Sequence, residues 1–390
     1  MPRESIKYQQ EELFKSPNNW VKTKLKYPKR TLRIGSLFSG IGAFEQALKK
    51  IKLDYEVVFA SDNDKFVKES YLSNYKLDKK NWFDDVNDII GEKYKSKIDL
   101  LVGGPPCQSF SMVGKRKGLE DARGNLSINF IKLVNKIRPK VFVYENVKSL
   151  LTVNKGHDWK ILNNYFKKTG YSFYFSTLNA KDYGVPQNRE RLFVVGFRNK
   201  VNFNFPNPIR LKHSMQDLLE NEFDNKYYLP PKGISFVTKE KNLKKQYTQL
   251  NGKIALCQKR NQQFNWHGDF VLYDKDYMKK YYLSEKVKKY VLASGTKNFY
   301  SKPEIDLKVA RPLVSTMHKM HRSGVDNYIT VNKKVIRKLT PRECLRLQGF
   351  PDSFKQVVSD TQIYRQAGNS IVVDVITAIL KEMDISLYAR

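Results

Sequence analysis

Short apolar segments alternate with helix-like segments between residues 32 and 203, and this alternation constrains the fold more than any other feature. We expect strands at 32–38, 57–60, 98–102, 141–144, 171–178 and 192–195. Helices are expected at 43–50 and 160–168, and two further helices are expected to end near residues 75 and 136. Strands that alternate with helices predict an α/β fold with a doubly wound, mostly parallel sheet. Ligands of such sheets bind at the carboxyl ends of the strands.

The alternation of strand-like and helix-like segments ends after residue 203. Residues 204–335 carry scattered prolines, many lysines and aromatic residues with no steady period, which indicates a smaller domain. A helix is expected to begin at Thr340-Pro341, because proline suits the first helical turn. A last apolar helix near 372–382 is expected to pack on the sheet. We therefore divide the chain into a basic N-terminal arm (1–30), an α/β domain (31–203 with 366–390), a smaller inserted domain (204–335) and a supporting hinge helix (336–365).

Charge indicates the partner. Lys and Arg number 71 against 39 Asp and Glu, a net charge of +32. An excess of this size attracts polyanions and makes their binding depend on salt, so nucleic acid is the leading partner.

Other classes of protein are disfavoured. Cys107, Cys257 and Cys344 are too few for a disulfide framework, and no Cys/His spacing suits zinc, so we expect no metal. Reduced cysteines suit the cytoplasm. Neither a run of about 18 apolar residues nor a signal peptide is present, so we expect neither a membrane partner nor export.

The first two expected strands end in residues suited to a cofactor. Phe38–Gly42 (FSGIG) lies where the first strand meets a helix, and glycines there let backbone N–H groups approach a ligand. Asp62 ends the second strand, where a carboxylate can accept hydrogen bonds from ribose hydroxyls. Asp85 follows the next turn. A plain tight turn and ordinary helix N-caps are the alternatives.

Gly104–Ser109 (GPPCQS) is the sharpest motif in the chain. Two prolines stiffen the exit from a buried strand and fix the direction of the next side chain, Cys107. A cysteine beside a helix N-terminus or cationic groups can be a reactive thiolate. A lone cysteine is more often a buried apolar residue, and we assign Cys257 and Cys344 to that class.

A carboxylate and two arginines follow. Glu145 ends an apolar strand, where it is either a paired structural group or a proton donor of raised pKa. Arg189 and Arg191 are expected on one face of an incipient strand that includes residues 185–191, where two guanidinium groups could orient a carboxylate or a base carbonyl. Surface ion pairs with Glu190 are the alternative.

The order of these segments resembles that of the cytosine-5 DNA methyltransferase family, from Leu32 to about Leu380 apart from 204–335. Phe38–Gly42, Gly104–Ser109 and Glu145–Val147 resemble its cofactor, nucleophile and glutamate motifs. Further matches are Gln187–Arg191 with its arginine motif, Arg337–Glu343 with its supporting helix, and Tyr364–Ser370 with its last cofactor motif.

The resemblance implies a DNA (cytosine-5)-methyltransferase of the bacterial restriction-modification type, with a Rossmann-like fold and S-adenosylmethionine as cofactor. Cys107 would attack C6 of a cytosine flipped out of duplex DNA, assisted by Glu145, Arg189 and Arg191. The implied DNA contacts are Gln108, Ser111, Lys115 and Arg116. The implied cofactor contacts are Phe38, Gly40, Ile41, Gly42, Asp62, Asn63, Asp85, Val86, Gly104, Pro106, Leu126, Asn369 and Ser370.

The resemblance also assigns partners. Residues 204–335 would form the target-recognition domain. Double-stranded DNA is the expected substrate, a separate restriction endonuclease for the same site is a candidate partner, and a monomer is expected.

Four other readings compete. A cytosine-5 RNA methyltransferase shares these motifs, although a variable domain of this length favours duplex DNA. A catalytically silent DNA-binding homologue would keep the fold, yet Cys107 and Glu145 are intact. An exocyclic amino-methyltransferase needs no nucleophile and should carry an aromatic residue after Pro106. A nicotinamide dehydrogenase would leave Pro105-Pro106-Cys107 and the charge unexplained.

Overall fold

The computed structural model describes residues 20–106, 125–220, 224–260, 266–274, 284–296, 299–300 and 334–390. The chain divides into two compact units, one of Met1–Phe270 with Lys338–Arg390 and one of Val271–Arg337. The four-part division expected from the sequence, with a recognition domain at 204–335, stays a prediction.

A seven-stranded sheet forms the centre of the larger unit, in the order β3-β2-β1-β4-β5-β7-β6. Strands β3, β2, β1, β4 and β5 run parallel, whereas β7 is antiparallel to both β5 and β6. Their bounds are β1 Leu32–Leu37, β2 Tyr55–Ser61, β3 Trp82–Phe83, β4 Leu100–Gly103, β5 Val141–Val147, β6 Ser172–Asn179 and β7 Glu190–Phe197. The predicted doubly wound, mostly parallel α/β fold is therefore confirmed.

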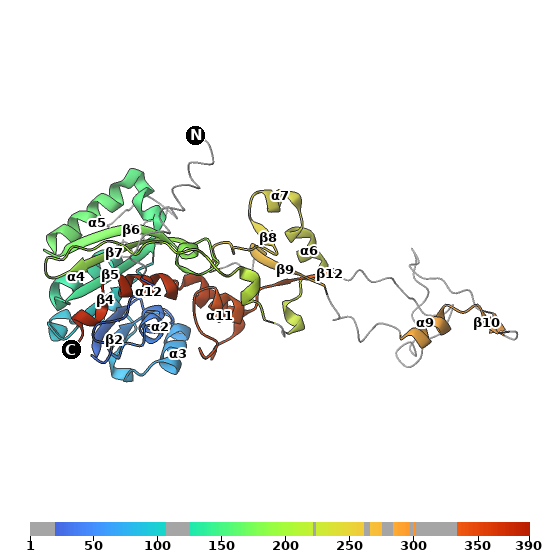
Figure 1. The fold of residues 1–390 in the computed structure, drawn as a ribbon, viewed down its shortest axis with the longest axis horizontal. Coiled ribbons are helices and arrows are strands. Elements are labelled where there is room, and N and C mark those ends of the chain that lie inside the picture. The colour runs from blue at the N-terminus through green and yellow to red at the C-terminus, as the bar shows by residue number, and fades with distance from the viewer. Residues whose placement is uncertain are drawn as a thin grey trace. The chain divides into compact units, whose positions relative to one another are not determined.

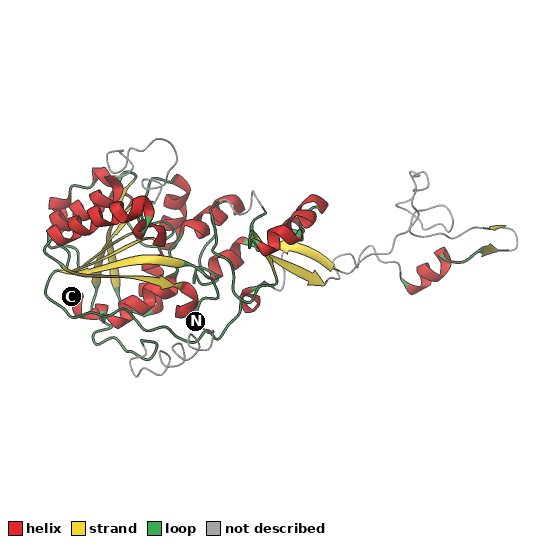
Figure 2. Ribbon diagram, turned by 90° about the horizontal axis from the view of Figure 1, so that it is seen from above, coloured by secondary structure: helices red, strands yellow, loops and turns green. Residues whose placement is uncertain are grey.

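Helices cover both faces of this sheet. Figure 1 shows α4 and α5 on one side and α2, α3 and α12 on the other, and Figure 2 shows helices on both sides of the strands. Their bounds are α2 Ala43–Lys50, α3 Lys65–Asn74, α4 Asn125–Ile137, α5 His157–Lys168 and α12 Val373–Glu382. The core under α4 and α5 is aromatic: Phe130, Phe142 and Phe166 are fully buried and stack or meet edge to face. Large aromatic side chains of this kind dominate the energetics of a core.

Local sequence explains where the helices begin. Helix α3 begins after Asp64, whose carboxylate accepts hydrogen bonds from the backbone N–H groups of Phe66 and Val67. Helix α10 (Pro341–Arg346) begins after Thr340 with a capping box to Glu343 and Pro341 in its first turn, as the sequence predicts. Helix α11 (Asp360–Asn369) follows and leads into α12.

The register of the parallel strands aligns their carboxyl ends. Leu37 at the end of β1 pairs with Ser61 of β2 and with Gly103 of β4. Gly103 in turn pairs with Tyr144 of β5. The residues that follow these four positions therefore emerge at one edge of the sheet, and we call this the carboxyl edge.

The segment after residue 203 adds small elements to the larger unit. These are α6 (Pro231–Val237), α7 (Glu240–Lys244), β8 (Thr248–Leu250) and the first three residues of β9 (Gly268–Asp274), and β8 pairs in parallel with β9 across 248–250 and 268–270. Strand β12 (Lys334–Lys338) completes a three-stranded sheet in the order β12-β9-β8. The smaller unit holds α9 (Glu285–Val291) and an antiparallel pair, β10 (Gly295–Thr296) and β11 (Phe299–Tyr300).

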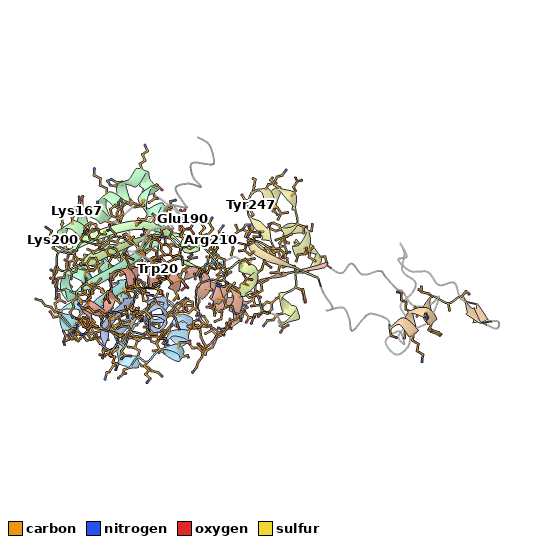
Figure 3. All side chains as sticks on the ribbon, viewed as in Figure 1. Trp20, Lys167, Glu190, Lys200, Arg210 and Tyr247 are labelled. Carbon is orange, nitrogen blue, oxygen red and sulfur yellow. The ribbon has the colours of Figure 1, made fainter. Side chains whose placement is uncertain are left out.

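The described part of the N-terminal arm packs on the larger unit. Trp20, labelled in Figure 3, is buried, and its indole Nε1 donates a hydrogen bond to the carbonyl of Asn207 at 3.1 Å. The backbone N–H of Lys26 donates to Asp384 at 3.2 Å. Within the described residues, no helix combines the length and the apolar character needed to cross a membrane.

Candidate active site

The turn after β1 leaves open space beside its backbone. Phe38, Gly40 and Gly42 all have positive φ angles, of 51°, 52° and 79°. A Cβ placed on Gly40 would meet no atom within 4 Å, whereas one on Gly42 would overlap the ring of Tyr75. Ile41 is buried. The absence of a side chain at Gly42 therefore makes room for the ring of Tyr75, whereas Gly40 is the position where a ligand could approach the backbone closely.

Asp62 stands beside this turn. Its Oδ2 accepts a hydrogen bond from the backbone N–H of Gly40 at 3.0 Å, and its Oδ1 accepts one from Asp64 at 3.1 Å. Burial raises the pKa of the Asp62 carboxyl, while these hydrogen bonds oppose the rise. The structure thus brings together two residues that the sequence placed 22 positions apart.

The remaining predicted cofactor contacts on this side differ in exposure. Asn63 and Asp85 are exposed, and Asp85 accepts a hydrogen bond from the backbone N–H of Asn87 at 2.8 Å. Val86 is buried in the core cluster under α4, and Leu126 packs against the same cluster. Val86 can therefore offer a ligand little more than its backbone.

Glu145 lies at the centre of the carboxyl edge. The side chain is 8% exposed, and a Cβ on Gly104 would stand 2.9 Å from its Oε2. The same Cβ would stand 3.3 Å from Ile371 Cδ1. Gly104 therefore leaves room for the carboxylate, and it joins the end of β4 to Glu145 on β5 and to the residue that follows Ser370.

Arg191 is the partner of Glu145. Its Nε lies 3.3 Å from Glu145 Oε1. Burial raises the pKa of Glu145, and the positive charges of Arg191 and Arg189 oppose the rise. The carboxyl group therefore holds its proton to a higher pH than an exposed glutamate does.

Arg189 has different partners from Arg191. It is 3% exposed, its Nη2 donates to the carbonyls of Ser370 at 2.6 Å and Gly368 at 3.1 Å, and its Nη1 donates to the carbonyl of Gln258 at 3.0 Å. Its Nε has no hydrogen-bond partner among the described residues. Burial lowers the pKa of Arg189 to about 10. Arg189 thus ties the start of β7 to the end of α11, where Asn369 is exposed.

The predicted nucleophile and the predicted DNA contacts lie outside the described residues. These are Cys107, Gln108, Ser111, Lys115 and Arg116. The segment that leads to Cys107 is described as far as Pro106, which is exposed. Asn146 Nδ2 donates to the carbonyl of Pro105 at 3.2 Å and so holds this segment beside β5.

Two buried amides complete the site and escaped the sequence analysis as site residues. Asn146 follows Glu145 directly, so its place at a strand end was a usable signal. Gln187 is fully buried, and its Nε2 donates to the carbonyl of Leu347 at 2.7 Å while its Oε1 accepts from the N–H of Gln258 at 3.2 Å. Its partners lie 160 and 71 residues away, and no local pattern reveals them.

The fold and this edge define a class of protein. A mostly parallel, seven-stranded sheet with a glycine turn after its first strand and acidic residues at its carboxyl edge is a Rossmann-like enzyme domain.

Comparison with known proteins identifies the family. The model of the C-5 cytosine-specific DNA methylase family matches residues 32–384. The orphan methyltransferase M.SPRI of Bacillus phage SPR is 31% identical over 427 residues, which cover 90% of this chain and 97% of that protein. The type II methyltransferase M.SsoII of Shigella sonnei is 34% identical over 360 residues, which cover 90% and 79%. The chain belongs to the C-5 cytosine-specific DNA methylase family.

Solved structures share the fold. A mutant of Spodoptera frugiperda DNMT2 superposes with a TM-score of 0.63 at 22% identity, covering 91% of this chain and 99% of its own. The Entamoeba histolytica methyltransferase EhMeth gives 0.64 at 17% identity, covering 91% and 98%. At these identities the likeness concerns the fold alone.

Proposed function

We propose that this enzyme transfers a methyl group from S-adenosylmethionine to C5 of a flipped cytosine in duplex DNA, through a covalent bond between Cys107 and C6. The observation that carries the proposal is the carboxyl edge. There Glu145 is buried against Arg191 and packs on Gly104, three residues before the cysteine. We further propose that it acts in the cytoplasm as a monomer, and that a separate endonuclease recognises the same site.

The residues at the ends of β1 and β2 fit the cofactor. The space beside Gly40 accepts a ligand against the backbone, and Asp62 lies next to it with carboxylate oxygens that have further acceptor capacity. Asp85 is an exposed carboxylate suited to polar groups of an adenosine. When bound, S-adenosylmethionine supplies an electrophilic methyl group on a sulfonium. Asp62 and Gly40 would hold its nucleoside part and so fix the direction in which the methyl group points.

The Cys107 thiolate adds to C6 and the electrons of the C5–C6 double bond move toward N3, where Glu145 donates its proton. C5, made nucleophilic by this addition, would then accept the methyl group that S-adenosylmethionine would supply, with the thioether S-adenosylhomocysteine as the leaving group. A base then removes the C5 proton, the C6–S bond breaks to release the thiolate, and the N3 proton returns to Glu145. C5 of cytosine is a poor nucleophile until C6 is saturated, so the thiol is needed.

Glu145 is suited to the proton transfer. Burial keeps its carboxyl protonated to a higher pH than usual, and a general acid works best when its pKa lies near the working pH. Arg191 would hold the carboxyl in place and stabilise its anion after donation. Arg189, whose Nε lacks a hydrogen-bond partner in the part of the chain that the structure describes, would support the edge from the side of Ser370.

Gly40→Val should weaken cofactor binding. The new side chain would fill the space assigned to the cofactor and would be strained at a φ of 52°. We expect the dissociation constant for S-adenosylhomocysteine, measured by calorimetry, to rise roughly tenfold to a hundredfold, about 1.4–2.7 kcal/mol, because the side chain blocks the close approach of the cofactor to the backbone.

Gly170→Val is the matched control. Gly170 also has a positive φ, of 73°, and open space around its Cβ, but it lies before the start of β6, at the opposite edge of the sheet. Gly170→Val should lose about as much stability as Gly40→Val but should keep the affinity of the unmodified chain for S-adenosylhomocysteine. Equal affinities in both variants would refute the cofactor site at Gly40.

Binding of duplex DNA should weaken steeply with salt. A net charge of +32 brings lysine and arginine near phosphates, and each phosphate neutralised releases counterions. Titrating a labelled duplex at rising NaCl should give a log–log slope of roughly −4 to −8. A flat profile would mean that the excess charge lies away from the nucleic acid.

Supplying labelled cofactor with duplex DNA and, separately, with folded RNA tests the substrate. Label in DNA alone supports the proposal. Label in RNA alone would replace it with the RNA-methylating alternative.

A further inference from the structure

A buried carboxylate outside the proposed reaction holds a loop of the larger unit. Asp269 on β9 is 2% exposed. Its Oδ2 accepts a hydrogen bond from the backbone N–H of Leu256 at 2.9 Å, and its Oδ1 accepts one from Gln249 Nε2 at 2.8 Å. Gln249 Nε2 also donates to the carbonyl of Ile254 at 2.8 Å. Asp269 and Gln249, which we call the clamp, therefore grip the segment 254–256 through its backbone.

The loop that the clamp holds also contacts residues 186–191, which include Arg189 and Arg191 and which we call the arginine segment. Ala255 donates to the carbonyl of Pro186 at 2.7 Å and accepts from Asn188 at 2.9 Å, so the loop and the segment 186–188 pair like two strands. Gln258, at the end of the loop, donates its N–H to Gln187 Oε1 and accepts from Arg189 Nη1. Each link is a backbone or buried hydrogen bond, and the chain of links ends on Arg189.

The two faces of the loop thus have different neighbours. One face is held by the clamp, and the other face supplies acceptors and donors to residues 186–189. Buried polar groups that lose a partner cost more than the bond was worth, so a shift of the loop would disturb its far face too.

We infer that Asp269 is a positioning residue for methyl transfer: through the loop 254–258 it fixes Arg189 and the start of β7, and with them the partner of Glu145. This inference rests on the proposed function for its effect on turnover. Its structural part, the coupling of Asp269 to residues 186–191, stands independently of that function.

The carboxylate is needed as a pure acceptor. Both neighbours, Leu256 N–H and Gln249 Nε2, are donors. In Asp269→Asn the side-chain amide would face one of these donors with its own N–H groups whichever way it turned. Asp269→Glu keeps an acceptor on a longer side chain. If the hydrogen bonds of Asp269 position the loop, Asp269→Glu should keep a higher kcat than Asp269→Asn. If only the volume of the side chain matters, Asp269→Asn should keep the higher kcat.

The test combines hydrogen exchange with kinetics on the full-length chain. Burial raises the pKa of Asp269 to about 7, so both measurements belong at pH 8.5, where the carboxylate is ionised. Asp99→Asn is the matched control, because Asp99 is a fully buried carboxylate that pairs with Arg33 and Lys140 before the start of β4, at the opposite edge of the sheet. We expect exchange in peptides covering 254–258 and 186–191 to quicken roughly tenfold in Asp269→Asn and to stay unchanged in the control.

Kinetics then separate positioning from stability. On a duplex that carries the methylated site, kcat of Asp269→Asn should fall between roughly tenfold and a hundredfold with KM for the cofactor unchanged. The kcat of Asp269→Glu should lie between that of Asp269→Asn and that of the unmodified chain. Asp99→Asn should have a lower melting temperature but an unchanged kcat. Unchanged exchange at 186–191, unchanged kcat, or asparagine outperforming glutamate would each overturn the inference. If the unmodified chain methylated no nucleic acid, the proposed function would fail, and the exchange data would still decide whether the clamp holds the arginine segment.

Discussion

Cys107→Ala should abolish methyl transfer and leave DNA binding intact. Without the thiolate, nothing saturates C6, and C5 stays too weak a nucleophile to take the methyl group. Alanine removes only a sulfur atom, so the contacts of the duplex with the rest of the chain should persist. Incorporation of labelled methyl into plasmid DNA should drop below detection, while gel-shift affinity should change by less than roughly threefold, about 0.65 kcal/mol.

Cys344→Ala is the control for this variant. Cys344 is a buried cysteine on α10, and its loss should cost some stability but no chemistry. Normal turnover by Cys107→Ala would show that the covalent mechanism is wrong. Loss of turnover in both variants would point to damaged folding and not to a lost nucleophile.

Glu145→Gln should slow the chemical step by roughly 10²- to 10⁴-fold, the usual contribution of a general acid. Glutamine can hydrogen-bond the base but cannot give it a proton, and it leaves Arg191 without its ion pair. Single-turnover methylation should show the loss, while affinity for S-adenosylhomocysteine should stay within about threefold. A variant that lost only cofactor affinity would contradict this role.

Glu190→Gln is the matched control for Glu145→Gln. Glu190, labelled in Figure 3, is an exposed glutamate at the start of β7 that pairs with Lys148. Because exposed pairs contribute little, its replacement should leave turnover unchanged.

The pH dependence has a definite sign. Because burial raises the pKa of Glu145, the folded protein binds this proton more tightly than the unfolded chain does. Its contribution to stability is therefore present at low pH and is lost as the pH rises through the folded pKa. Proton donation to the base is lost over the same range, so the single-turnover rate should fall on the alkaline side, and Glu145→Gln should lack that limb.

Much of the sheet could be predicted from the sequence, because parallel strands place their ends at one edge. Asp62, Gly104 and Glu145 each follow an apolar run, and the register of Leu37, Ser61, Gly103 and Tyr144 brings those positions together. Thr340 and Pro341 marked the start of α10 through capping alone. The reversed direction of β7, which runs antiparallel to both β5 and β6, left no local signal.

The hydrogen-bond partners of the site residues could not be predicted from the sequence. Arg189 was expected beside Arg191 on one face, and the structure shows that its guanidinium bonds to carbonyls 69 to 181 residues away. Asp269 shows no pattern in its neighbourhood that distinguishes it from a surface carboxylate. Such contacts depend on tertiary packing that periodicity and capping do not encode.

Bisulfite sequencing of plasmid DNA from cells that express this chain, beside the same plasmid from cells that express Cys107→Ala, tests whether the chain methylates C5 of cytosine in DNA through Cys107. We expect protected cytosines at one short recurring sequence with the unmodified chain and none with the variant. Unprotected cytosines throughout, with folded protein present, would contradict it.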